Sequence, residues 1–319
     1  MFLRNLVRAF PFSMLTMACS QVAGQDYPSR PIRVVTSATA SAADFVARIM
    51  AQGLAAELGQ QVIVDNRSSS LVPGQNVAQA QPDGHTLLVH GPTFWIGALM
   101  RSTPYDTERD FAPITLATSS PNILVVHPAV AVRTVKDLIA LAKSKPGEFN
   151  YGSAGSGSSS HLAGELFNAM AGVKIVRVPY ANNALRMADI LSGQVQVMFP
   201  SPAPMMPHIR SGRLRALAVT SPQPSVLVPD LPTVAASGLP GYESVSMFGM
   251  FAPARTPAAV LSLLNRLSVQ VLNRPEVREK FFNAGAEVIA SSPAQFAATV
   301  KAERERLGKV IRDAGIREE

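Results

Sequence analysis

Short runs of β-branched and apolar residues alternate along this chain with segments whose apolar residues recur at helical spacing. This alternation is typical of βαβ units and predicts an α/β fold with a mainly parallel sheet. We expect strands at residues 32–35, 61–65, 86–90, 123–127, 150–153, 173–178, 194–199 and 215–220. We expect helices at residues 44–58, 134–144, 161–171, 184–192, 257–273 and 293–313.

The chain has 319 residues, which is enough for two domains. A strand-like segment at 111–119 runs through Pro121 directly into the next strand, and the strand that ends near Thr220 is followed by a proline-rich stretch. We take these two places as crossings between lobes. The prediction is one lobe at residues 122–220 and another made of 25–121 plus 221–319, joined by two hinge crossings around a cleft that can close.

The first 24 residues have the order of an export signal. Arg4 and Arg8 precede an apolar stretch at 9–18, and small residues lead up to a cleavage site after Gly24. The apolar stretch is shorter than the ~20 residues of a membrane span, and Pro11 would interrupt a helix there. We therefore predict a signal peptide at residues 1–24 and a periplasmic mature protein.

The single cysteine, Cys19, lies within this leader. It follows a weak lipoprotein motif, so a lipid-anchored form is an alternative to a free mature chain. Cleavage after Gly24 would leave no thiol, which excludes disulfides, cysteine nucleophiles and zinc-thiolate sites. Removing Arg4 and Arg8 also lowers the formal charge from +7 to +5, a mild excess that does not indicate nucleic-acid binding.

A glycine- and serine-rich loop from Tyr151 to His161 follows a predicted strand and opens a predicted helix. Glycines allow close backbone approach, and the amides of a helix N-terminus favour an anion, so we expect an anion-binding loop. A plain turn capped by Ser159 or Ser160 is one alternative. Another is an NAD-binding oxidoreductase, since Gly155-x-Gly157-x-x-Ser160 resembles a dinucleotide motif, but the third glycine and the ribose-binding acid are missing.

A second loop rich in hydroxyls, Thr36 to Asp44, lies between the first strand and its helix. Ligands of open α/β sheets bind beyond the carboxyl ends of strands, so the two loops would face each other across the cleft. Asp44 has two interpretations, as a cap of the helix that follows or as a direct contact to a ligand.

Catalytic signatures are lacking. The five histidines have no metal-ligand spacing, no carboxylate pair is evident, and neither a P-loop nor a nucleophile elbow occurs. Adjacency of Ser159 and His161 does not define a catalytic dyad. We expect no enzymatic activity, metal or cofactor, while Phe94 and Trp95 would either line the cleft or pack in the core.

Across nearly the whole mature chain, the sequence resembles the Bug-type (TctC-like) solute receptors of tripartite tricarboxylate transporters. The resemblance rests on these motifs: Tyr27-Pro-Ser-Arg-Pro-Ile-Arg33, Leu58-Gly-Gln-Gln-Val62, Asn66-Arg67, Gln81-Pro-Asp-Gly-His-Thr-Leu87, Pro104-Tyr-Asp106, Asp110-Phe-Ala-Pro113, Tyr151-Gly-Ser-Ala-Gly155, His161-Leu162, Val178-Pro-Tyr180, Gly212-Arg-Leu-Arg-Ala-Leu-Ala-Val-Thr220, Leu231-Pro-Thr233 and Phe251-Ala-Pro253. It implies a type II-like Venus-flytrap protein, monomeric, that captures a small mono- or dicarboxylate and delivers it to membrane transporter subunits.

The resemblance also implies the residues that would bind the ligand. They are Thr36, Ser37, Thr39, Ser41, Asp44, Ser153, Ala154, Gly155, Ser156, Gly157, Ser158, Ser159, His161, Tyr180, Asn182 and Asn183. The chain departs from the family where the first loop has Thr, Ser and Ala in place of Pro and Gly. Arg186 would pair with a second carboxylate if it faces the cleft, and Pro200-Ser201 supplies no acid for an amino group. The effector domain of a transcription regulator can share this fold, and this alternative is disfavoured because a predicted leader, not a helix-turn-helix motif, stands before residue 25.

Overall fold

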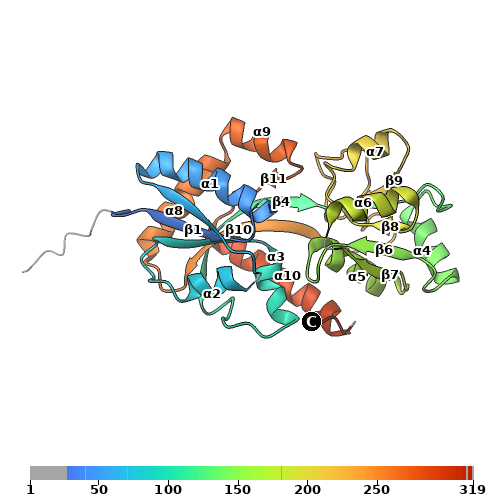
Figure 1. The fold of residues 1–319 in the computed structure, drawn as a ribbon, viewed down its shortest axis with the longest axis horizontal. Helices are drawn as coiled ribbons and strands as arrows, with labels where there is room; N and C mark the ends of the chain where they lie inside the picture. Colours follow the sequence, from blue (N-terminus) through green and yellow to red (C-terminus); the bar gives the residue numbers. More distant parts are fainter. Residues whose placement is uncertain (1–26, 40, 70, 181, 314, 318–319) are drawn as a thin grey trace, which may run out of the picture.

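The computed structural model describes residues 27–39, 41–69, 71–180, 182–313 and 315–317 (Figure 1). The predicted leader at 1–24, with Cys19, lies outside these residues. The described chain forms two sheets, each flanked by helices, which confirms the predicted α/β fold class. None of the described helices is both long enough and apolar enough to cross a membrane.

The first sheet has the strand order β11-β4-β10-β3-β1-β2 in the described chain. Its strands are β1 (Ile32–Thr36), β2 (Val62–Asn66), β3 (Thr86–His90), β4 (Phe111–Pro121), β10 (Val245–Pro253) and β11 (Glu287–Val288). Its helices are α1 (Ala42–Leu58), α2 (Val72–Ala78), α3 (Pro92–Trp95), the 3₁₀ turn η1 (Gly97–Leu99), α8 (Ala258–Leu272), α9 (Pro275–Asn283) and α10 (Pro293–Asp313).

The second sheet has the order β7-β6-β8-β5-β9. Its strands are β5 (Ile123–Val126), β6 (Asn150–Ser153), β7 (Val176–Pro179), β8 (Val197–Met198) and β9 (Arg215–Val219). The helices of this part are α4 (Val135–Ser144), α5 (Ser159–Ala171), α6 (Asn183–Ser192) and α7 (Met206–Arg210). All described strands between residues 123 and 219 therefore belong to one sheet.

The prediction of a mainly parallel sheet is wrong, because both sheets are mixed. In the first sheet β1 pairs in parallel with β2 and β3, whereas β10 is antiparallel to β3 and β4, and β11 is antiparallel to β4. In the second sheet β5 is antiparallel to both of its neighbours. The local βαβ pattern accounts for the parallel pairs, while the longest antiparallel pair joins β4 and β10, which lie far apart in the chain.

Central strands such as β3 and β5 are buried on both faces, so successive strand residues enter different cores. In β1, Val34 packs with α1 and α8 residues, whereas Val35 belongs to a cluster on the other face. That second cluster continues from Trp95 and Phe296 beside the first sheet to Leu166 beside the second. A single apolar core thus joins the two halves on one side, where α10 also contacts α5.

Two chain crossings run side by side between the sheets (Figure 1). β4 passes through Pro121 and Asn122 into β5, and β10 pairs antiparallel with β4 as far as Val245 and Pro121. Thr220 at the end of β9 ties the crossings together: its backbone N donates to Asn122 O at 2.9 Å, and its hydroxyl accepts from Asn122 N at 2.8 Å. These hydrogen bonds hold the two crossings together, beside the apolar core that the two halves share.

Helix ends show where local sequence determines structure. Ser41 caps α1 by accepting a hydrogen bond from Asp44 N at 3.1 Å, so the cap is Ser41 and Asp44 lies in the first turn. Similarly, Ser158 caps α5, which corrects the alternative caps Ser159 and Ser160. The C-cap at Gly59 is confirmed, with a left-handed φ of 61°.

Candidate functional site

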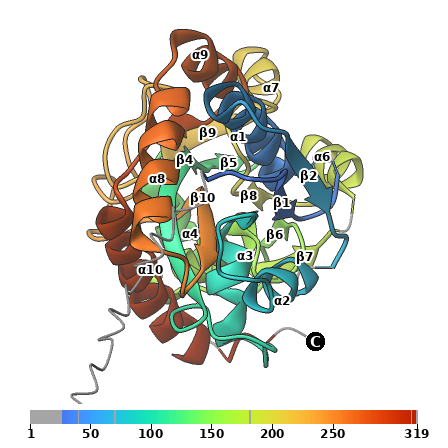
Figure 2. The ribbon, with the colours of Figure 1, turned by 90° about the vertical axis from the view of Figure 1, so that its left-hand side faces the viewer.

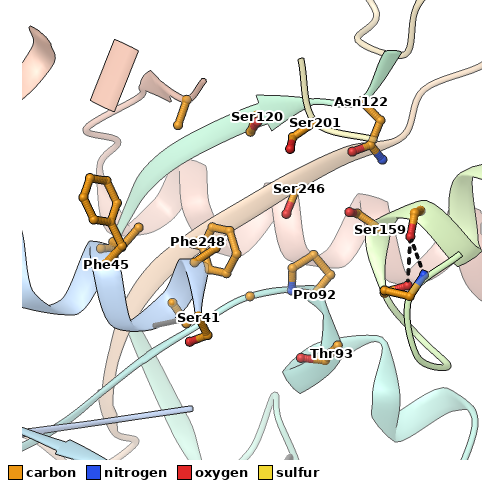
Figure 3. A pocket seen from close by; sticks show the side chains of 18 of the residues that line it. Ser41, Phe45, Pro92, Thr93, Ser120, Asn122, Ser159, Ser201, Ser246 and Phe248 are labelled. Atoms are coloured by element: carbon orange, nitrogen blue, oxygen red, sulfur yellow. Dashed lines mark hydrogen bonds between the residues drawn. The ribbon is translucent and has the colours of Figure 1, made fainter. Parts of the chain in front are cut away.

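A cleft of about 510 Å³ lies between the two sheets. One wall comes from the β1–α1 loop, the residues after β3 and helix α9, and the other comes from the 154–160 loop and the start of α6. The crossing strands form its floor with Ser120, Asn122 and Ser246 (Figure 3). The volume is within the usual range for a site that encloses a small molecule.

Three helices begin at this cleft: α1, α5 and α6. Ala42 and Ala43 of α1, Ser159 and Ser160 of α5, and Asn183 of α6 are first-turn residues that line it. Backbone N–H groups in a first turn have no acceptor within the helix, and the helix dipole makes this end positive. The convergence of three such ends favours a bound anion.

His90 lines the cleft at the end of β3 and is almost fully buried. Burial lowers the pKa of His90 to about 4, so the imidazole is neutral at neutral pH. Its Nδ1 accepts a hydrogen bond from Gly91 N at 3.0 Å, which assigns the proton to Nε2. His90 therefore offers the cleft a neutral N–H donor.

Arg186 lines the same cleft from the first turns of α6. Among the described lining residues it is the one with a permanent charge, and no carboxylate lines the cleft. Its Nη1 donates to Ser160 Oγ at 3.3 Å, and burial lowers its pKa. The prediction left open whether Arg186 faces the cleft, and the structure shows that it does.

Four of the lining residues carry a buried polar atom without a hydrogen-bond partner: His90 Nε2, Thr118 Oγ1, Asn122 Nδ2 and Arg186 Nε. Nε2 of His90 is a donor, as are the amide and guanidinium nitrogens, and a hydroxyl can donate. An unpaired buried polar group costs about 1–3 kcal/mol, which a ligand with acceptor oxygens would recover. The cleft therefore has an excess of donors.

The loop at 153–160 is held from behind by two side chains. Arg177 donates through Nε to Ser153 Oγ at 2.8 Å and through Nη2 to Ala154 O at 3.2 Å. His161 Nδ1 accepts from Gly157 N at 3.1 Å, and burial, with the nearby charge of Arg177, lowers the pKa of His161 to about 4. A neutral imidazole thus fixes the loop and uses the Gly157 amide.

The β1–α1 loop is fixed by buried polar contacts of its own. Thr36 donates to Val89 O at 2.9 Å, and Asn66 Nδ2 donates to both Ser37 O and Asp44 Oδ1 at 2.8 Å. No described residue of this loop has a positive φ. The Thr, Ser and Ala residues found where the family has glycine therefore meet no backbone strain there.

The predicted ligand-binding residues divide into two groups. Those that line the cleft are Ser37, Ser41, Ala154, Gly157, Ser158, Ser159 and Asn183. Those that do not line it are Thr36, Thr39, Asp44, Ser153, Gly155, Ser156, His161, Tyr180 and Asn182. Most of the second group support the loops, and their roles toward a ligand stay predictions.

Three members of the second group show what this support involves. Asp44 forms an ion pair with Arg48 Nε at 2.9 Å and lies 3% exposed. Tyr180 donates to Asp189 Oδ2 at 2.6 Å, and burial raises the pKa of Tyr180 to about 12. Asn182 caps α6 through its side chain. These contacts orient the helix starts that face the cleft.

The sequence prediction missed the lining residues that lie on or near strands. They include His90, Thr93, Thr118, Ser120, Asn122, Ser201, Ser246 and Phe248. Figure 3 shows Ser120, Ser201 and Ser246 gathered along the crossing strands, with Phe45 and Phe248 on the side of α1. Two signals in the sequence could have found some of them. His90 is the last residue of a predicted strand, and the two predicted ligand-binding loops also follow the ends of strands. Ser120 and Asn122 lie on either side of Pro121, at a predicted crossing between lobes.

Phe94 and Trp95 pack in the core, at 1% and 0% exposure, and do not line the cleft. Trp95 Nε1 donates to the buried Glu303 Oε2 at 2.5 Å. No group of three or more His, Cys, Asp or Glu side chains suitable for a metal occurs in the described part of the chain.

Comparisons with known proteins agree with one another. The family model described as "Tripartite tricarboxylate transporter family receptor" matches residues 46–316. A Pseudomonas protein named "UPF0065 protein in tcbD-tcbE intergenic region" is 34% identical over 97% of this chain and 93% of its own length.

Two solved structures similar to this chain are named together with a ligand. "R. palustris Rpa4515 with adipate" is 34% identical, with a TM-score of 0.78 over 92% of this chain and 99% of its own. "MatC (Rpa3494) from Rhodopseudomonas palustris with bound malate" is 28% identical, with a TM-score of 0.74 over 89% and 100%. None of these findings supports the oxidoreductase alternative based on Gly155 and Gly157.

Proposed function

This chain belongs to the tripartite tricarboxylate transporter receptor family, and we propose that it captures a small carboxylate in the cleft between its sheets for delivery to the membrane subunits of such a transporter. The family is one of periplasmic solute-binding receptors and not of enzymes. The solved relatives named with adipate and malate support a carboxylic acid as the ligand, because both compounds are dicarboxylates.

The donor excess of the cleft is the observation that carries this proposal. Three helix N-termini and four residues that carry an unpartnered polar atom line a space that no carboxylate lines in the described chain. A carboxylate offers acceptor oxygens only, and its charge is stabilised by both helix dipoles and N–H donors. A cation would find no carboxylate partner among the described lining residues.

Capture would take place by hinge closure of two lobes, at residues 122–220 and at 25–121 plus 221–319. The separation of the strands into two sheets and the Asn122–Thr220 junction support this division. A ligand that contacts both walls favours the closed state by its extra contacts there. Membrane subunits would recognise the surface that closure creates.

Export and cleavage after Gly24 are part of the same proposal, as is a monomeric mature protein. The full chain, expressed with its leader in a Gram-negative host, should appear in the periplasmic fraction with Gln25 as its first residue by N-terminal sequencing. Light scattering after size exclusion should give the mass of one chain. Cytoplasmic protein that retains residues 1–24 would contradict export.

Ligand binding is tested with this periplasmic protein after unfolding and refolding to remove bound solute. Melting temperatures are measured with mono- and dicarboxylates of three to eight carbons, with uncharged diols of equal length, and with NAD. A ligand at 100 times its Kd stabilises the folded state by about 2.7 kcal/mol, which corresponds to several degrees. We expect carboxylates to raise the melting temperature and diols and NAD to leave it unchanged.

Asn122→Ala gives a matched variant for the site. It removes the unpartnered Nδ2 donor and should weaken carboxylate binding by about 10-fold, since a hydrogen bond to a charged group contributes about 1.5–3 kcal/mol. Asn273→Ala removes an amide that bonds to Val269 O at 2.9 Å, away from the cleft, and should not change affinity. The proposal fails if no acid binds the wild type, or if NAD alone shifts its melting.

A further inference from the structure

Arg186 is a partly buried cation without a carboxylate partner in the described chain. Several other arginines form ion pairs, as in Arg30–Asp83 and Arg304–Glu108. Arg186 has no ion-pair partner among the described residues, although its Nε is buried. Its one hydrogen bond goes to a neutral hydroxyl, Ser160 Oγ, at 3.3 Å. A sheltered guanidinium without a counterion is unfavourable unless something else supplies the negative charge.

The position of Arg186 concentrates positive charge on one wall of the cleft. Ser159 and Ser160 at the start of α5 line this wall, as does Asn183 at the start of α6, one turn before Arg186. The positive ends of both helix dipoles therefore act beside the guanidinium. An acidic group here would be bound by a full charge, two helix ends and several hydroxyls.

The opposite wall can hold an anion without a fixed charge. It offers the first turn of α1, the hydroxyls of Ser37 and Ser41, and the neutral His90 with its Nε2–H donor. No Lys or Arg lines this wall in the described chain. The cleft thus has two separate places for acidic groups, one on each wall, and Arg186 belongs to only one of them.

We propose that Arg186 binds the second acidic group of a dianionic ligand, so that this receptor selects dicarboxylates over monocarboxylates of the same chain length. One acid group of the ligand lies at the α1 wall and the other at Arg186, so that the ligand links the two walls. This inference rests on the proposed carboxylate-binding function and adds the class of acid and the residue that selects it. Planar guanidinium binds carboxylate oxygens in pairs, which an ammonium cannot reproduce.

The ligand pair for the test is adipate and hexanoate, which share six carbons and differ by one carboxylate. Titration calorimetry at fixed ionic strength compares the wild type with Arg186→Met, Arg186→Lys and, as a control for the lost charge, Arg210→Met. Arg210 is exposed on α7 and does not line the cleft. The pairs succinate with butyrate and suberate with octanoate extend the comparison to other lengths.

We expect the wild type to bind the diacid of at least one pair about 10- to 100-fold more tightly than its monoacid. R186M should lose most of this ratio by weakening the diacid while leaving the monoacid within about threefold, and R186K should recover part of it. R210M should keep the ratio of the wild type. Circular dichroism and thermal melting establish whether each variant is folded. If R186M does not fold, the ratio is compared between the wild type and R186K alone.

Three outcomes would overturn the inference. Equal binding of diacid and monoacid by the wild type would show that no second acid group is recognised. Equal weakening of both acids in R186M would show that Arg186 only positions the 154–160 loop through Ser160. Monoacid binding without diacid binding would exclude the dianion and leave the proposed function intact, whereas failure of every acid on the wild type would reject that function itself.

Discussion

Thr118 in β4 provides a test in which one substitution should stabilise the protein and impair its site. Its side chain is 1% exposed and its Oγ1 has no hydrogen-bond partner. Thr118→Val replaces this hydroxyl by a methyl group of similar size and keeps a β-branched side chain suited to a strand. Since an unpaired buried hydroxyl costs about 1–3 kcal/mol, T118V should raise the free energy of unfolding by about 1–2 kcal/mol.

The same substitution three residues earlier should have the opposite effect. Thr115 Oγ1 donates to Ser291 O at 2.8 Å and is fully buried in the same strand. Thr115→Val removes that bond and leaves a buried carbonyl with fewer donors, which should lower stability by about 1–2 kcal/mol. Both variants lose one buried hydroxyl from β4, but only the Thr115 hydroxyl has a hydrogen-bond partner. A difference between the two variants therefore reports the effect of that hydrogen bond.

Calorimetric melting of ligand-free protein measures both variants, with about 2–4 °C expected per kcal/mol for a chain of this size. T118V should melt above the wild type and T115V below it. The added stability from a carboxylate ligand should be smaller in T118V, because its site has lost one donor. If T118V melts as far below the wild type as T115V does, Thr118 is satisfied in the folded protein and the donor-excess argument loses one of its four atoms.

Three further changes test other parts of the structure. Gly157→Ala places a side chain at a residue with φ 74°, and its Cβ would lie 2.6 Å from Met100 Cε. This substitution should lower the free energy of unfolding by about 1–2 kcal/mol and weaken ligand binding in calorimetry. Adding Met100→Ala should remove the contact with Met100 but not the backbone strain. Burial raises the pKa of Glu303 from 4.5 to about 7. The folded protein therefore holds this proton more tightly than the unfolded chain, and the free energy of unfolding should fall by about 3 kcal/mol as pH rises from below 4.5 to above 7. Urea unfolding at pH 5 and pH 8 should show most of this fall in the wild type and little of it in Glu303→Gln. Thr220→Val removes the hydroxyl that bonds to Asn122 N and O at 2.8 Å and should increase amide exchange at the junction; unchanged exchange would mean that backbone pairing alone holds it.

Local pattern predicted the elements whose apolar residues are regular. β1 and β3 are short segments rich in Val, Leu and Ile, and α10 begins after Ser292, whose hydroxyl accepts from Gln295 N at 3.2 Å. β10 was missed because Val245–Pro253 contains Gly249 and two methionines and has no two-residue alternation. Gly249 is required by its neighbours, since a Cβ there would meet Phe296 at 2.2 Å, which no local pattern could indicate.

The site was predictable to the extent that it lies at helix starts. Ser41 and Ser158 cap two of the three helices that begin at the cleft, and cap residues have a sequence signal. Thr118 and Ser246 lie on strands that pair with neighbours far along the chain, so their direction depends on register and not on adjacent residues. The neutral state of His90 depends in turn on burial, which only the assembled fold provides.

The distribution of contacts indicates how binding energy would be used. On one side the halves already share a core, and Tyr242 donates to Ala163 O at 2.8 Å between them. On the cleft side the donors are divided: His90 and Thr118 belong to the first sheet's half, while Arg186 and the start of α5 belong to the other. A ligand with an acid group at each end would supply acceptors to the unpaired groups of both walls. It would thereby favour closure of the cleft, with the halves rotating about the core that they share. A monoacid would satisfy one wall only, so selectivity for dianions and closure of the cleft would follow from the same unpaired groups.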